Sequence, residues 1–149
     1  MTLYDIYPKY ADRDFAFIIK AQERVRNYFI FDFNHDFLKH PIVNLDYDAG
    51  FHDEIVNIMN DDYYFTASGI VLLSKKVYEV LSHLDQNLTF YPCTLKNQPS
   101  NIYALYKEID IHSPYVIRNA EHSTTYYFSQ LFINLIEEYH WNIHHYSIQ

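Results

Sequence analysis

The pattern of apolar and polar residues in the first half of the chain predicts several strands. Residues 15–19 and 28–33 are rich in β-branched and aromatic side chains, and the polar stretch 20–27 between them has the length of a hairpin connection or a short helical turn. Residues 42–47 alternate between apolar and polar, the period of a strand with one buried face. We expect two further short strands at residues 63–66 and 69–73.

Three segments carry the spacing of an amphipathic helix. Apolar residues three and four positions apart predict a short helix over 52–59, a second over 75–84 and a third over 128–139. Ser74 stands immediately before the second segment, where its oxygen can accept a hydrogen bond from a free backbone N–H, so we expect it to be the N-cap.

The remaining apolar segments complete the expected fold. Residues 88–95 and 102–106 predict two antiparallel strands joined by a polar, Pro-containing loop, and residues 141–148 predict a final strand or a tail. We therefore expect a single α+β domain over residues 1–149, in which two to three helices pack on a mostly antiparallel sheet of about five to six strands.

Composition supports a folded domain and excludes several classes of protein. The chain has 149 residues, of which 49% are hydrophobic and 19% aromatic, so it has enough apolar area to offset the entropy of ordering. Only two glycines leave no Gly-rich phosphate cradle. The net charge of −8 opposes nucleic-acid binding, and the apolar runs are too short to span a membrane. With one cysteine and no visible secretory signal, the expected location is the cytoplasm.

The candidate catalytic and metal-binding groups are weak. Asp32, His35 and Asp36 place two carboxylates and an imidazole within five residues, which suits acid–base chemistry, but the same composition is common where a strand ends in a turn. His140 and His144 have a spacing that shares a helix face, but they lack the H-E-x-x-H pattern of a zinc enzyme. Cys93 has no neighbouring cation to lower its pKa. We therefore expect no catalytic residues, no metal and no cofactor.

The distribution of charge is more informative. No Lys or Arg occurs between Lys39 and Lys75, while this stretch holds six acidic residues and several tyrosines. Tyrosine is enriched at the centres of protein interfaces, and complementary charge accelerates the encounter with a partner. We therefore expect a binding surface for a basic protein, formed by the following residues: Asp46, Asp48, Asp53, Glu54, Asp61, Asp62, Tyr63 and Tyr64.

Three segments carry a resemblance to a known family. Residues 61–81 (DDYYFTASGIVLLSKKVYEVL) combine an acidic residue, a short apolar strand and a serine followed by basic residues and a helix. An aromatic-proline strand follows at 90–95 (FYPCTL), and a strand with tyrosine and leucine at 103–106 (YALY). In this order and spacing the chain resembles the immunity proteins of the eleven type, which are found beside polymorphic toxins in bacteria.

The resemblance implies a cytosolic protein that has no catalytic residues and that binds a cognate toxin domain, covering its active face. Many toxins of these systems attack nucleic acid, so the toxin is expected to be basic, and a nuclease is one candidate. Two alternatives remain open. One is another acidic inhibitor or adaptor, such as a phage-encoded mimic of nucleic acid, and the other is a small enzyme that uses Asp32, His35 and Asp36.

Overall fold

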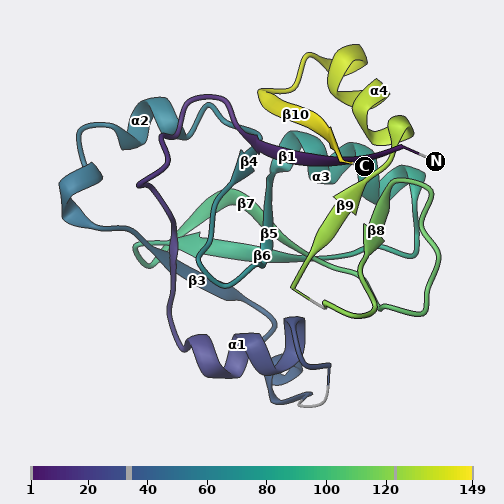
Figure 1. The fold of residues 1–149 in the computed structure, drawn as a ribbon. Helices are drawn as coiled ribbons and strands as arrows, with labels where there is room; N and C mark the ends of the chain where they lie inside the picture. Colours follow the sequence, from purple (N-terminus) through teal and green to yellow (C-terminus); the bar gives the residue numbers. More distant parts are fainter. Residues whose placement is uncertain (1, 33–34, 123, 149) are drawn as a thin grey trace.

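The computed structural model describes residues 2–32, 35–122 and 124–148, and within them the chain forms an α+β fold dominated by two sheets. The expected fold class is confirmed. The strands, however, divide between two sheets, because the two ends of the chain and the segment before the last helix form a sheet of their own (Figure 1).

The smaller sheet has four strands in the order β10-β1-β9-β8, all antiparallel: β1 (Leu3–Pro8), β8 (Val116–Arg118), β9 (Tyr126–Phe128) and β10 (Ile143–Ile148). Its longest pairing joins the two ends of the chain, with Leu3 opposite Ile148. The two termini therefore lie side by side in Figure 1. Residues 141–148 thus form a strand, and β1 gives that strand its partner.

The larger sheet has six strands in the order β2-β3-β6-β7-β5-β4: β2 (Ile18–Ile19), β3 (Val43–Asp46), β4 (Tyr63–Tyr64), β5 (Val71–Ser74), β6 (Thr89–Leu95) and β7 (Gln98–Tyr106). All its pairings are antiparallel except that of β3 with β6. The expected β6–β7 hairpin is confirmed, but its connection is only the two residues Lys96 and Asn97, both with positive φ.

Four α-helices are described: α1 (Gln22–Phe29), α2 (Ile55–Ile58), α3 (Lys75–Leu84) and α4 (Gln130–Tyr139). Two short 3₁₀ helices, η1 (His35–Lys39) and η2 (Ala49–Phe51), precede β3 and α2. Helix α3 has the bounds that the sequence predicts, and Ser74 Oγ accepts from the Val77 backbone N–H as its N-cap. Ser129 caps α4 in the same way.

The prediction of a strand over residues 28–33 is wrong, because this segment begins with the end of α1 and continues into a turn. Val25, Tyr28 and Phe29 are buried on one face of α1, at the spacing of a helix. The residue that precedes the helix, Ala21, has a left-handed backbone and no capping side chain. The usual polar signal for a helix start is therefore missing from the sequence.

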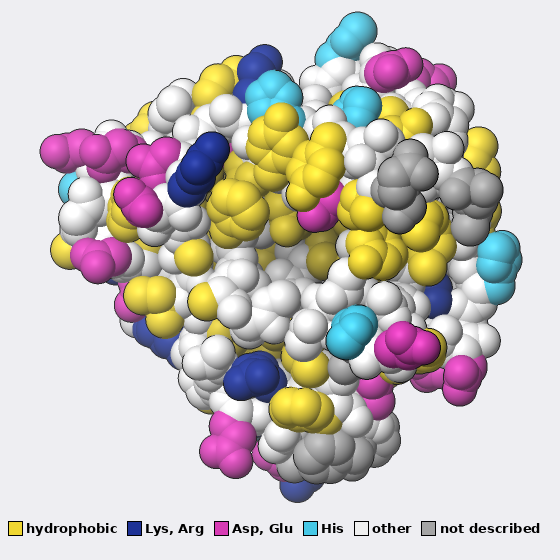
Figure 2. Space-filling model, viewed as in Figure 1, with side chains coloured by type: hydrophobic (Ala, Val, Ile, Leu, Met, Phe, Trp, Pro, Cys, Tyr) yellow, Lys and Arg dark blue, Asp and Glu magenta, His cyan; other side chains and the backbone are white. Residues whose placement is uncertain are grey.

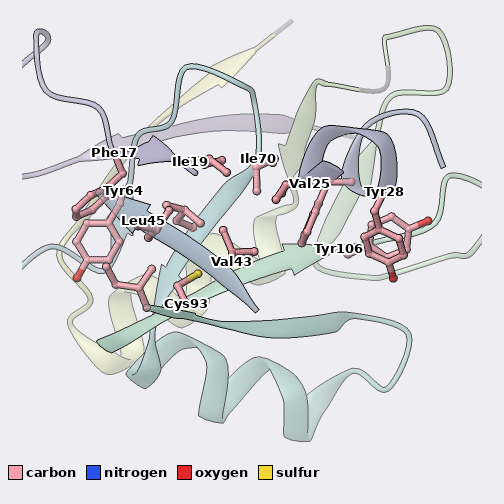
Figure 3. Packing of buried hydrophobic residues seen from close by; sticks show 14 of the residues in the cluster. Phe17, Ile19, Val25, Tyr28, Val43, Leu45, Tyr64, Ile70, Cys93 and Tyr106 are labelled. Carbon is pink, nitrogen blue, oxygen red and sulfur yellow. The ribbon is translucent and has the colours of Figure 1, made fainter. Parts of the chain in front are cut away.

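Two hydrophobic clusters hold the layers together. In the first, Val25 and Tyr28 of α1 lie over Val43, Cys93 and Tyr106 of the larger sheet (Figure 3). The second cluster fills the space between the other face of β5 and β7, helices α3 and α4, and the smaller sheet. The six-stranded sheet is therefore buried on both faces around β5 and β7, and it separates the two clusters.

Candidate functional site

Exposed acidic side chains gather around α2 and the loop that leads to it. Asp48, Asp53 and Glu54 are all exposed, and Asp12 and Asp14, which come from the segment after β1, are exposed as well. Asp12, Asp53 and Glu54 line a hollow of about 350 Å³, together with Tyr10, Phe51 and Asn57. Figure 2 shows a group of acidic side chains over the region of α2. We call Asp12, Asp48, Asp53 and Glu54 the α2 acidic surface.

The local structure explains why these carboxylates face water. Asp48 is the N-cap of η2, and its Oδ1 accepts from the Gly50 backbone N–H at 2.9 Å. The chain then turns through η2 into the four-residue helix α2, of which only Ile58 is buried. Asp53 and Glu54 lie at the start of this helix and form no ion pair with a described Lys or Arg. Their charges therefore remain available to a partner.

Asp46 is not part of the α2 acidic surface, because its charge is paired with that of Lys96. Its Oδ1 accepts from Lys96 Nζ at 2.5 Å, and the same lysine lies 4.3 Å from the ring centroid of Tyr47. The Lys96 ammonium holds the pKa of the Asp46 carboxyl below its usual range. Asp46 is thus partly neutralised, although the sequence around it contains no base.

The structure corrects the expectation that Asp61 contacts a partner. Asp61 is only 1% exposed. Its two carboxylate oxygens accept from three successive backbone N–H groups, those of Lys9 and Tyr10 at 2.7 and 2.8 Å and that of Ala11 at 2.9 Å. Burial raises the pKa of the Asp61 carboxyl, while these three donors act in the opposite direction. Asp61 fixes the segment that follows β1 against the start of β4.

The same correction applies to Asp62 and to Tyr64, which are 3% and 2% exposed. Asp62 accepts from the Ser74 hydroxyl at 2.7 Å and from the Asn142 backbone N–H at 2.7 Å, so it joins the start of α3 to the turn before β10. Tyr64 belongs to the first hydrophobic cluster. Tyr63 is partly buried and packs against the second cluster, and burial raises its pKa above the usual range.

The two carboxylates of the candidate acid–base group, Asp32 and Asp36, have different partners. Asp32 pairs with the buried Arg118 at 2.9 Å and accepts from the Tyr106 hydroxyl at 2.5 Å. Asp36 pairs with Lys39 at 3.0 Å and lies 3.7 Å from Arg24. The side chain of His35 lies outside the described part of the chain. The two carboxylates are therefore directed to different cations.

Cys93 and the described histidines belong to no group that could hold a metal ion. Cys93 is buried between strands, and burial raises the pKa of its thiol above the usual range. Within residues 2–32, 35–122 and 124–148, no three His, Cys, Asp or Glu side chains are grouped so that they could hold a metal ion. His144 and His145 point to opposite faces of β10, because successive side chains alternate along a strand.

A hollow of about 600 Å³ lies beside the N-terminus of α3. It is lined by Lys75, Lys76 and Glu79, and by Asn60 and Asn101 from neighbouring loops. Lys75 Nζ lies 3.9 Å from Glu79 Oε1, so part of its charge is balanced within the helix. The walls of this hollow mix both signs of charge, unlike those of the hollow beside α2.

The sequence pattern does not indicate that Asp12 and Tyr10 belong to the candidate surface. The only local signal was the pair of acids on either side of Arg13, which is short compared with the acidic stretch from 46 to 62. The position of Asp12 depends on a tertiary contact that the local sequence does not reveal. Asp61 binds the backbone of residues 9–11 and thereby brings Asp12 beside α2.

Comparisons with known proteins identify no relative. No model of a protein family, no curated protein and no solved structure matches this chain. Among the described residues, every helix is too short or too polar to cross a bilayer.

Proposed function

We propose that this protein is an immunity protein that acts in the cytoplasm, where it binds a basic toxin domain and neutralises it by covering its active face. The α2 acidic surface carries the proposal. Its four carboxylates are exposed and come from two separate segments, and three of them, those of Asp12, Asp53 and Glu54, border a hollow whose lining contains no Lys or Arg. A surface of this charge attracts basic partners and raises the rate of encounter.

The aromatic residues beside these acids supply contact area. Tyr10 is 39% exposed, and it lines the same hollow as Phe51. Charge mainly raises the rate of association and the specificity of a complex. Affinity also needs aromatic side chains that become fully buried on binding. The resemblance carried by residues 61–81 supports the toxin-neutralising role, and the net charge of −8 makes nucleic acid and anionic membranes poor partners.

A binding titration with a charge-reversed variant tests the proposal. The probe is the purified protein encoded by the gene immediately upstream, titrated calorimetrically at low and at high salt. We expect a complex that weakens with salt, and that weakens by about tenfold or more in the double variant Asp53→Lys, Glu54→Lys. The matched control is Glu137→Lys, Glu138→Lys, which makes the same change in net charge on exposed residues of α4.

A growth assay tests whether the protein neutralises its partner in cells. Co-expression of the native chain should restore growth to cells that express the upstream protein, the α2 variant should fail to do so, and the α4 variant should succeed. Absence of any complex at low salt would overturn the proposal. Equal loss of binding in both variants would show that net charge matters rather than the α2 acidic surface.

A further inference from the structure

A third hollow lies between the two sheets, at the centre of the face shown in Figure 2. Its volume is about 200 Å³, and its walls come from β1, β4, β9 and the segment that leads into β5. Gly69, with φ of 80°, approaches Thr124 so closely that a Cβ would lie 3.0 Å from the Thr124 carbonyl oxygen, which closes one side.

The lining of this hollow combines aromatic rings with one charged group. Its aromatic residues are Tyr63, which is partly buried, and Tyr126 and Phe128, which are buried at 7% and 2% exposed; the other lining residues except Asp5 are uncharged. Aromatic faces carry negative quadrupole charge and attract cations, the more so when water is excluded. The hollow therefore offers a cation the Asp5 carboxylate beside the partly buried Tyr63.

Asp5 has no cationic partner of its own among the described residues. Its Oδ1 accepts from the Ile6 backbone N–H at 2.9 Å, and its Oδ2 accepts from the Tyr146 hydroxyl at 2.9 Å. These two bonds fix the carboxylate and leave each oxygen with room for a second donor. Arg118, a buried cation, lies 5.7 Å from the Tyr126 ring centroid and is paired with Asp32.

We propose that this hollow receives the side chain of an arginine from the protein partner, with Asp5 as its counter-ion. The proposal rests on the proposed function for the source of the arginine. A volume of about 200 Å³ is below the roughly 300–1,000 Å³ of ordinary small-molecule sites, and it suits a single long side chain. Arginine fits better than lysine, because its planar guanidinium stacks on rings and can bind both oxygens of a carboxylate.

The surroundings of Asp5 indicate that the guanidinium group comes from a protein partner. Tyr7 and Tyr146 are 40% and 53% exposed, and their ring centroids lie 5.9 Å apart on the same face of the small sheet as Asp5. After β1 the chain runs directly into Tyr10 and Asp12, so a single basic partner can contact this face and the α2 acidic surface together. Exposed tyrosines around a charged pocket are a common form of interface hot spot.

Titration with a blocked amino acid tests the hollow without the partner. N-acetyl-arginine amide is added to the full chain, with amide chemical shifts followed by NMR, and N-acetyl-citrulline amide serves as the neutral probe of the same shape. We expect the arginine probe to bind in the millimolar range, to shift residues that line the hollow, and to bind about tenfold more tightly than the citrulline probe.

Variants assign the effect to Asp5. Asp5→Asn keeps an acceptor for the Tyr146 hydroxyl, so it should fold, and it should remove the preference for arginine over citrulline. Tyr63→Leu keeps apolar volume but removes a ring, and it should weaken the arginine probe several-fold. The matched control is Glu138→Gln, which removes an exposed charge on α4 outside the hollow and should leave the probe unaffected.

The outcomes separate this inference from the proposed function. Equal binding of the two probes, binding of neither, or a preference that survives Asp5→Asn would overturn the inference. Tighter binding of free arginine than of the blocked form would overturn the assignment to a protein side chain. If the upstream protein binds but Asp5→Asn has no effect on it, the proposed function stands and the inference fails. If the arginine probe binds while no protein partner does, the proposed function fails and the hollow remains a guanidinium site.

Discussion

Asp61 and Asp62 are adjacent carboxylates with different hydrogen-bond partners, so their replacement by asparagine should have different costs. Asp61 faces three backbone N–H donors, and an asparagine there must point its own NH₂ at one of them. Asp62 faces one N–H and the Ser74 hydroxyl, and a hydroxyl can turn to accept from an NH₂ group. We expect Asp61→Asn to lower the free energy of unfolding by about 2 kcal/mol and Asp62→Asn by about 1 kcal/mol or less.

Denaturant unfolding of the two variants measures this difference. Asp53→Asn is the control, because Asp53 is exposed and should change the free energy of unfolding by less than about 0.5 kcal/mol. The reverse order, with Asp62→Asn the more damaging, would contradict the argument from donors and acceptors.

The turn between β6 and β7 gives a test at the scale of an element. Lys96 and Asn97 both have positive φ, 50° and 65°, as in the two-residue turns that fit the twist of a hairpin. Asparagine tolerates this conformation better than most residues, and glycine adopts it without strain. We expect Asn97→Ala to lower the free energy of unfolding by about 1 kcal/mol and Asn97→Gly to leave it unchanged or raise it slightly.

Thermal or denaturant unfolding of both variants decides this point. The hydrogen bond from Lys20 Nζ to Asn97 Oδ1 is exposed and is lost in both, so it cancels in the comparison. Equal stability of the alanine and glycine variants would show that backbone strain is not the determinant at position 97.

Elements with a local signal were predictable from the sequence, and those defined by distant partners were not. Ser74 and the periodic apolar residues after it predict α3 with its observed bounds. By contrast, β8 and β9 are three residues long and depend on pairing within the small sheet and on packing in the second cluster, so no periodicity reveals them. The same reason limited the candidate site. Asp61 and Asp62 resemble surface acids in the sequence, but their partners at residues 9–11 and 142 bury them.

The buried tyrosines predict how the whole molecule responds to alkaline pH. Burial raises the pKa of Tyr28, Tyr63, Tyr64 and Tyr106 above the usual range, and that of Tyr126 to about 12. Each of these groups keeps its proton in the folded state, whereas in the unfolded chain it loses it near pH 10. Their contribution to stability is therefore complete below about pH 10, and above it is lost at up to about 1.4 kcal/mol per pH unit for each group.

Lys107 changes the pH dependence of stability in the opposite direction, because burial lowers its pKa. It is one group, whereas five buried tyrosines have raised pKa values. We therefore expect cooperative alkaline unfolding, with tyrosinate absorbance rising in two steps. The five buried tyrosines should ionise only together with the loss of circular dichroism. Tyr63→Phe removes one raised pKa and should make the decline with pH less steep. Ionisation of all 16 tyrosines in one step near pH 10, with the fold intact, would mean that the two hydrophobic clusters admit water and would contradict the burial on which these pKa shifts depend.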